Sequence, residues 1–293
     1  MAAAAEPLDY VALGDSSVSG TGVPIQESLL CTRSTKAWPK VVAAELGAEL
    51  TDVSCGSAQV KDFSSRQWGV VPPQYDALTP DTDLVTLTIG GNDIGLVQTA
   101  LSCLNLLPEP AGFSCKERYT AGAVDTISDA IAQWAPQLGA AVEEVRRRSP
   151  GAEIVVAGYG TYLREDGCHP VQPIWARDAN YLQAKIDELS SAMREQTVAH
   201  GATFVDLAPV TVGHDVCAAP RDRYLEGLVP VAPAAPLHPN AKGLAAYGAE
   251  VQPPSTQRAP GPDPPSRRLL VRLQVRPSKI ISTSNHHQPA TAW

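Results

Sequence analysis

The residues of this chain best suited to chemistry are a serine, an amide and a histidine, each set beside glycine or proline. Ser16 closes a Gly-Asp-Ser tripeptide, Asn92 follows two glycines, and His238 stands directly before a proline. A serine attacks a carbonyl group when a base removes its proton, and amide N–H groups stabilise the charge that develops on the carbonyl oxygen. Together these residue types indicate acyl transfer.

Each motif taken singly also fits an ordinary structural role. Gly-Asp-Ser is common in turns and helix caps, two glycines before Asn92 make a simple turn, and a single histidine beside proline is more often structural. A fourth loop of small residues holds Gly56 and Ser57, which could aim a backbone N–H into the same site. The conjunction of all four loops favours catalysis over four unrelated turns.

Strands and helices alternate along residues 8–250, and this alternation can bring such loops together. Short apolar or β-branched runs predict strands at residues 9–14, 49–54, 84–89, 153–157 and 203–206. Amphipathic or Ala-rich stretches predict helices at residues 37–46, 119–148, 173–200 and 240–250. The order predicts an α/β fold, a three-layer α/β/α sandwich around a central, mostly parallel five-stranded sheet. In such sheets the working residues lie in loops beyond the carboxyl ends of the strands.

Charge and hydropathy exclude two classes of protein. The 293 residues carry a net charge of −8, whereas a nucleic-acid-binding protein needs a basic surface to meet phosphates. No apolar run reaches the roughly 18 residues that a bilayer-spanning helix requires. We therefore expect no nucleic-acid partner and no transmembrane segment.

The last 43 residues differ in composition from the rest of the chain. From Val251 onward six Lys and Arg residues face Asp263 alone, and eight of the 26 prolines lie there. Two interpretations stay open: a basic arm for an anionic surface, or a disordered or frameshifted end, which the composition favours. The predicted organisation is an extension at residues 1–7, a catalytic domain at 8–250 and a tail at 251–293.

Six cysteines, none of them in a CxxC pair, indicate disulfides rather than a metal site. Six cysteines allow 15 pairings. We favour the local one because each bridge would tie a loop beside a predicted strand: Cys31–Cys55, Cys103–Cys115 and Cys168–Cys217. Disulfides imply an oxidising compartment. Residues 1–7 lack the basic and apolar parts of a signal peptide, so either the true start lies upstream or the sequence is that of the mature form.

The amino-acid sequences of these motifs resemble those of the SGNH hydrolases, the GDSL family of esterases and lipases. The runs YVALGDSSVSGTG, LTIGGNDIG and LHPNAKG are most similar to the secreted, disulfide-bearing actinobacterial branch, and the resemblance covers residues 8–250. It implies a flavodoxin-like fold, no metal and no cofactor. Ser16 would be the nucleophile and His238 the base, while Asn92 and the Ser16 N–H would be oxyanion donors.

One departure from the family pattern lies in the second block. Relatives commonly have a glycine where this chain has Ser57, and Gly56 stands one place early. A backbone N–H donor needs no particular side chain, so either Ser57 or Gly56 could supply it. The role of Gly91 is expected to be conformational.

A second departure lies beside the histidine. Many relatives have an acid three residues before it, where this chain has Ala235. Some members of this branch use a backbone carbonyl instead, and we expect the Ala235 carbonyl to accept the proton of His238 Nδ1. Four carboxylates are alternative acceptors: Asp15, Asp93, Asp206 and Asp215. The adjacent pair His214-Asp215 looks catalytic, but its place beside Cys217 fits a disulfide loop better.

The sequence therefore predicts a carboxylic-ester hydrolase that acts on an ester or lipid substrate as an extracellular monomer. A deacetylase or an acyltransferase using the same residues is an alternative within the same chemistry. A flavodoxin-like binding module without catalytic activity is the alternative from another class. The sequence does not support it, because no glycine-rich phosphate loop follows the first strand.

Overall fold

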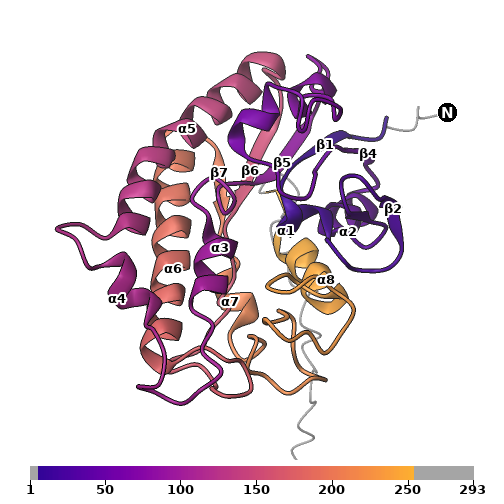
Figure 1. Ribbon diagram of the computed structural model, residues 1–293. Helices are drawn as coiled ribbons and strands as arrows, with labels where there is room; N and C mark the ends of the chain where they lie inside the picture. Colours follow the sequence, from indigo (N-terminus) through magenta and orange to yellow (C-terminus); the bar gives the residue numbers. More distant parts are fainter. Residues whose placement is uncertain (1–5, 254–293) are drawn as a thin grey trace, which may run out of the picture. The chain divides into compact units, whose positions relative to one another are not determined.

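Five parallel strands form the centre of the chain in a computed structural model that describes residues 6–253 (Figure 1). Their order is β4 (Glu49–Asp52), β1 (Asp9–Gly14), β5 (Leu84–Thr88), β6 (Glu153–Ala157) and β7 (Thr203–Val205). All five residues of β5 are buried, as are the last five of β1, so both faces of these strands are covered. The predicted sheet is confirmed, and every neighbouring pair in it is parallel.

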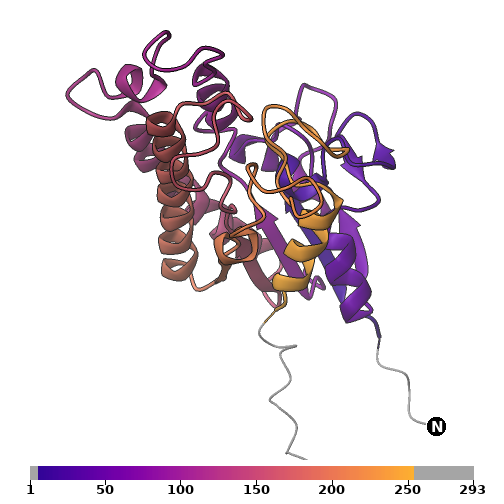
Figure 2. The same cartoon turned by 90° about the horizontal axis from the view of Figure 1, so that it is seen from below.

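Four long helices cover the two faces of this sheet (Figures 1 and 2). On one face α5 (Thr126–Arg148) packs against α6 (Ala176–Ala199), and on the other α2 (Trp38–Leu46) packs against α8 (Ala241–Glu250). Each buries an apolar stripe, such as Ile131, Leu138 and Val142 of α5. The result is the predicted three-layer arrangement.

Short elements fill the loops that follow the strands. They are α1 (Ser16–Ser19), the antiparallel pair β2 (Gln26–Ser28) and β3 (Arg33–Ser34), η1 (Val60–Phe63), η2 (Gln74–Ala77), α3 (Leu96–Ser102), α4 (Cys115–Tyr119) and α7 (Ala208–Thr211). Helix α1 follows β1, η1 follows β4, and α3 follows β5. The loops singled out from the sequence therefore meet at one edge of the sheet.

Two predicted helices and one predicted strand differ from the structure by two or more residues at one end. The helix expected at residues 119–148 begins only at Thr126, because Asp125 caps its start by accepting from the N–H groups of Ile127 and Ser128, and Tyr119 ends the separate helix α4. The helix expected from residue 173 begins at Ala176, since Ile174 pairs with Leu104 in an isolated bridge. The strand expected at 49–54 ends at Asp52, whose carboxylate accepts from the Ser54 N–H.

The three predicted disulfides are present: Cys31–Cys55, Cys103–Cys115 and Cys168–Cys217. They close loops with sequence separations of 24, 12 and 49 residues. Cross-links of this kind stabilise a fold by about 2–4 kcal/mol each, largely by restricting the unfolded chain. All of them lie in segments outside the central sheet, where regular backbone pairing contributes least.

Parts of the predicted organisation lie outside the described residues. This holds for residues 1–5 of the predicted extension and for residues 254–293 of the predicted tail. Val251 is fully buried, its N–H donates to the Tyr247 carbonyl, and Pro253 is buried as well, so packed residues continue beyond the end of α8. In residues 6–253 no helix has the length and apolar character to cross a bilayer.

Candidate active site

The turn after β1 presents Ser16 at the start of helix α1. Gly14 has a φ of +137°, and a Cβ at this position would lie 2.5 Å from the Thr88 carbonyl oxygen, so the turn requires glycine. The buried Gln74 side chain forms two hydrogen bonds with the same glycine. It accepts from the Gly14 N–H at 2.7 Å and donates to the Gly14 carbonyl at 3.0 Å. The Ser16 N–H has no acceptor within residues 6–253, which leaves it available to a substrate oxygen.

His238 contacts this serine directly. Its Nε2 lies 2.7 Å from Ser16 Oγ, and its Nδ1 lies 2.7 Å from the Pro236 carbonyl oxygen. A carbonyl only accepts, so Nδ1 carries the ring proton and Nε2 is free to accept the proton of Ser16. The structure thus joins a nucleophile and a base separated by 222 positions in the sequence.

The expectation that the Ala235 carbonyl orients His238 is wrong. The acceptor is the carbonyl of Pro236, two residues before the histidine. The intervening Leu237 has a φ of +63°, which turns the chain back so that the nearer carbonyl faces the ring. Ala235 instead donates its N–H to the Thr21 carbonyl at 3.0 Å and anchors the loop to the segment after α1.

Burial sets the protonation state of the base. Desolvation lowers the pKa of His238 below its usual value, while the Pro236 carbonyl and the charge of Asp15 act in the opposite direction. A lowered pKa keeps the imidazole neutral at neutral pH, which a general base requires.

The oxyanion donors come from the loops after β4 and β5. Ser57 has a φ of +62°, and its N–H has no acceptor within the described part of the chain. Asn92 donates one amide N–H to the Ala58 carbonyl at 3.0 Å, so its second N–H remains to meet an oxyanion. Ser16, Ser57, Asn92 and His238 border one hollow.

Gly56 does not fit the role of oxyanion donor that the sequence left open for it. Its N–H donates to the Cys31 carbonyl at 2.8 Å, so that hydrogen is already bound. A Cβ on Gly56 would lie 2.3 Å from Thr32 Oγ1. This glycine is thus required for close packing, and the following residue, Ser57, supplies the free N–H.

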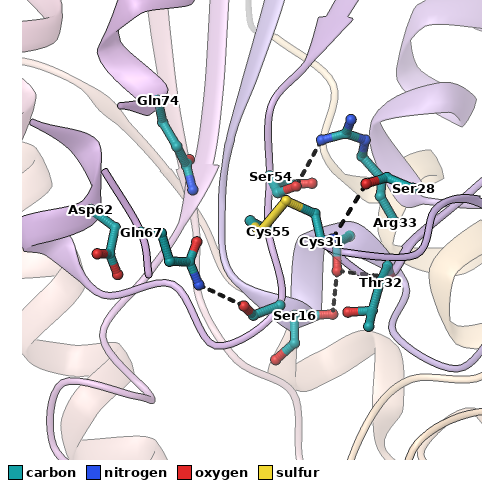
Figure 3. The surroundings of a disulfide bond; sticks show 12 residues. Ser16, Ser28, Cys31, Thr32, Arg33, Ser54, Cys55, Asp62, Gln67 and Gln74 are labelled. Atoms are coloured by element: carbon teal, nitrogen blue, oxygen red, sulfur yellow. Dashed lines mark hydrogen bonds between the residues drawn. A yellow bond between two sulfur atoms is a disulfide. The ribbon is translucent and has the colours of Figure 1, made fainter. Parts of the chain in front are cut away.

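The Cys31–Cys55 disulfide lies behind this turn (Figure 3). On the opposite side, the buried Gln67 donates through Nε2 to the Gly56 carbonyl at 2.8 Å. Arg33 donates to the Ser54 carbonyl at 2.9 Å. The turn before Ser57 is therefore held by a covalent bond and by contacts from two further segments.

A buried tyrosine, which sequence reasoning missed, joins the nucleophile turn to the Asn92 loop. The Tyr159 hydroxyl donates to Asp15 Oδ2 at 2.8 Å and accepts from the Gly91 N–H at 2.9 Å. Burial raises the pKa of Asp15, against hydrogen bonds from Ser17 and Tyr159 that favour the carboxylate. The Gly91 N–H is therefore already bound to Tyr159 and is not available to a substrate oxygen. Tyr159 follows β6, so its position beyond a strand end was the available signal.

Asp93 ties two loops together and does not touch the histidine. Its carboxylate accepts from the Val60 N–H at 3.1 and 3.3 Å, and the neighbouring Asn92 carbonyl accepts from Gln59. Burial raises the pKa of Asp93 to about 7. It therefore supports the Asn92 loop from the side of η1.

The other acidic alternatives also have partners elsewhere. Asp206 pairs with Arg194 at 2.8 Å, and Asp215 pairs with Arg164 at 3.0 Å. Asp215 also accepts from the Cys217 N–H at 2.7 Å, as expected for a residue in a disulfide loop. His214 stacks on the ring of Tyr224. No carboxylate in residues 6–253 accepts from His238 Nδ1.

A buried carboxylate, which no motif indicated, secures the loop that carries the base. Glu226 is fully buried; it accepts from Asn240 at 2.8 Å and from the Val231 N–H at 2.7 Å. Its own backbone N–H donates to the His238 carbonyl at 2.9 Å. Arg223 is also buried, and its guanidinium lies 3.6 Å from the Glu226 carboxylate. The positive charge of Arg223 therefore offsets the negative charge of Glu226.

Two hollows open beside Ser16 and His238. One of them has mainly apolar walls. Its apolar lining is Leu96, Val97, Ala100, Leu163, Ile174, Leu182, Ile186, Val216, Leu228 and Leu237. The second has mixed walls, made by Thr21, Leu30, Thr32, Ser57, Trp68 and Gln98. Within the described residues no cluster of three or more His, Cys, Asp or Glu side chains could hold a metal ion.

The chain is similar to known hydrolases in sequence. The model of the GDSL-like lipase/acylhydrolase family matches residues 12–246. Lipase 2 of Streptomyces coelicolor is 43% identical over 251 residues, covering 83% of this chain and 84% of the relative. A lipase of Streptomyces rimosus is 32% identical over 213 residues, covering 71% of this chain and 73% of that protein.

Solved structures show the same likeness in three dimensions. The extracellular lipase from Streptomyces rimosus superposes with a TM-score of 0.69 at 27% identity, covering 83% of this chain and 99% of the other. Phospholipase A1 from Streptomyces albidoflavus has a TM-score of 0.68 at 28% identity, with coverage of 82% and 98%.

Proposed function

The chain belongs to the GDSL-like lipase/acylhydrolase family, and we propose that this lipase/esterase works through an acyl-enzyme on Ser16 with His238 as its base. One observation carries the assignment. The His238 Nε2 lies 2.7 Å from Ser16 Oγ, while Nδ1 is bound to a carbonyl that holds the proton on the other side of the ring. This is the arrangement that an activated serine needs.

The first half of the reaction forms the acyl-enzyme. The Ser16 oxygen attacks the ester carbonyl carbon as its proton passes to His238 Nε2. The carbonyl oxygen becomes an oxyanion and accepts from the N–H groups of Ser16 and Ser57 and from the Asn92 amide. His238 then gives its proton to the alcohol oxygen, the carbon–oxygen bond breaks, and the alcohol leaves.

The second half repeats the steps with water. His238 takes a proton from a water molecule, which attacks the acyl-enzyme and forms a second oxyanion at the same donors. Collapse of this intermediate returns the proton to Ser16 and releases the carboxylic acid. In both halves the Pro236 carbonyl dipole and the charge of Asp15 stabilise the imidazolium, in the place of a paired acid.

Site-directed variants assayed on p-nitrophenyl butanoate test this mechanism. We expect Ser16→Ala and His238→Ala each to lower kcat by at least about 10⁴-fold, because removing either group disables the same step. A serine-directed phosphonate should add to one peptide, the one containing Ser16. Substantial turnover in Ser16→Ala, or an adduct on another peptide, would contradict the assignment.

We also propose that the enzyme works outside the cytoplasm, as a monomer. Three disulfides among six cysteines support an oxidising environment, as does the likeness to a lipase described as extracellular. Thiol titration of denatured, unreduced enzyme from the culture medium should find no free cysteine. Light scattering should give the mass of a single chain, and a dimer mass would reject the second half of the proposal.

A further inference from the structure

We propose that Tyr159 is a positioning residue for ester hydrolysis: its hydroxyl group holds the Asn92 amide in a fixed place relative to Ser16. The inference rests on the proposed function and deepens it, because it assigns the residue that aligns an oxyanion donor with the nucleophile. In this role Tyr159 acts through its two hydrogen-bond partners and not on the substrate.

Both partners of the hydroxyl are chain neighbours of reacting groups. Asp15, which accepts from Tyr159 at 2.8 Å, immediately precedes the nucleophile Ser16. Gly91, which donates its N–H to Tyr159 at 2.9 Å, immediately precedes the oxyanion donor Asn92. One oxygen atom therefore joins two loops that follow different strands of the sheet.

The position of this oxygen is itself fixed from two sides. The other carboxylate oxygen of Asp15 accepts from the N–H and the hydroxyl of Ser17, at 2.8 and 2.7 Å. The Asp15 N–H donates to the Thr88 carbonyl at 3.1 Å, at the end of β5. Tyr159 is anchored as well, because its own N–H donates to Ser190 Oγ of α6 at 3.1 Å. The Asn92 loop is thus attached to a point that does not move with it.

Burial determines the direction of both hydrogen bonds. Tyr159 and Asp15 are both buried, and burial together with the charge of Asp15 raises the pKa of Tyr159 well above its usual value. The phenol therefore keeps its single proton and gives it to the Asp15 carboxylate, so its oxygen is left to accept from Gly91. Without this oxygen the buried Gly91 N–H would lose its acceptor, which costs free energy until the backbone shifts to another partner.

The remaining contacts of Asn92 hold it from a different side. Its amide donates to the Ala58 carbonyl at 3.0 Å, and its carbonyl accepts from the Gln59 side chain at 3.1 Å. Both partners lie between β4 and η1. These bonds place Asn92 against the loop after β4, whereas the Tyr159 hydroxyl places it against the turn of Ser16.

The close approach of Gly91 to the tyrosine fits this role. A Cβ at Gly91 would lie 3.0 Å from the hydroxyl oxygen of Tyr159, closer than ordinary van der Waals contact, so the hydrogen bond depends on glycine. A catalytic group displaced by about 1 Å can lower a rate about 100-fold. Because an oxyanion donor acts on charge that develops during the reaction, a shift of the Asn92 loop would slow the chemical step more than it weakens substrate binding.

Tyr159→Phe removes only the hydroxyl group and tests the proposal. On p-nitrophenyl butanoate we expect kcat to fall about tenfold or more, with KM within about twofold of wild type, because the oxyanion forms after the substrate binds. In an Asn92→Ala background the same change should lower kcat by less than about threefold, since the donor that the hydroxyl positions is already absent. A loss of stability alone would act equally in both backgrounds.

Tyr10→Phe is the matched control. The Tyr10 hydroxyl is also buried and shares a 2.7 Å hydrogen bond with Thr86 on the neighbouring strand β5. Tyr10 is not among the described residues that border the two hollows. Its substitution should lower the melting temperature but leave kcat unchanged in both backgrounds.

Three results would overturn the proposal: wild-type kcat in Tyr159→Phe, an equal loss of kcat in both backgrounds, or an equal loss in Tyr10→Phe. If circular dichroism shows that Tyr159→Phe does not fold, Gly91→Ala replaces it in the same two backgrounds, because the added Cβ displaces the hydroxyl. Turnover retained in Ser16→Ala, measured in the same assay, would instead reject the proposed function.

Discussion

The nucleophile side and the base side of the site are held by different means. Ser16, Ser57 and Asn92 lie within five residues of the ends of strands β1, β4 and β5, and a disulfide and a buried tyrosine link their loops. His238 lies in an irregular segment between α7 and α8. The buried Glu226 holds this segment together through hydrogen bonds to Val231, Asn240 and the His238 carbonyl. Regular structure therefore positions one partner of the proton transfer, and a buried charged group positions the other.

This difference predicts how each side fails. Where the sheet positions a residue, a substitution removes a single interaction and leaves the frame intact. On the base side, the buried Glu226 carboxylate holds several segments of one loop. Its substitution removes several contacts together and leaves the buried Arg223 without an opposite charge. Four predictions follow, from the largest effect to the smallest.

On the nucleophile side, Asn92→Ala should lower kcat by about 10²–10³-fold with little change in KM or melting temperature. The amide donates to the oxyanion that forms after substrate binds, so its loss is felt in the transition state. Steady-state kinetics with a thermal melt measure both quantities. A loss confined to KM would mean that Asn92 binds the substrate and does not stabilise the oxyanion.

On the base side, Glu226→Gln should lower kcat about tenfold and also lower the melting temperature. Glutamine keeps the size of the side chain but removes the charge that compensates Arg223, so the segment around His238 loosens. The pH profile separates this role from a general loss of structure, because a displaced imidazole titrates differently. Wild-type kcat in Glu226→Gln would show that the carboxylate does not position the base.

The remaining acids should matter little for turnover. We expect Asp206→Asn and Asp215→Asn each to lower kcat by less than about tenfold, because both carboxylates pair with arginines away from His238. Kinetics on one soluble ester, with circular dichroism as the control for folding, decide this. A thousandfold loss in either folded variant would mean that a remote acid completes a triad.

Asp93 should link stability to pH. Its pKa is raised to about 7 in the folded chain, so between about pH 4 and 7 the folded state binds more protons than the unfolded state. The free energy of unfolding therefore falls across this range as the pH rises. Asp93→Asn removes the effect, so its melting temperature relative to wild type should be higher at pH 8 than at pH 5. If the difference in melting temperature between Asp93→Asn and wild type were the same at pH 5 and pH 8, the pKa of Asp93 would not be raised in the folded chain.

Most of the nucleophile side could be predicted from the sequence. Strand-forming runs are local patterns, and the loops after parallel strands must meet at one edge of the sheet. The disulfides were predictable on the same ground, since each pairing is local along the chain. The choice between Gly56 and Ser57 was not, because it depends on the Cys31 carbonyl and the Thr32 hydroxyl, which approach only in the fold.

The base side was less predictable for a physical reason. The acceptor for His238 Nδ1 depends on the φ of one residue, Leu237, and backbone conformation in an irregular loop leaves no periodic trace in the sequence. Glu226 appears in the sequence as an ordinary charged residue, and its complete burial exists only once residues 223–240 have folded. On the nucleophile side, Tyr159 was also missed, because it lies beyond a strand end but has no motif around it.

The disulfide beside Ser57 has a consequence for the timing of catalysis. With Cys31 bonded to Cys55, and with Gly56 clamped between the Cys31 carbonyl and Gln67, the turn is set when the protein matures. Donors that already point at the place where charge will appear need not reorient during the reaction. In a flexible turn the Ser57 N–H would have to be reoriented in every catalytic cycle. Here its orientation is established once, when the disulfide forms and the protein folds.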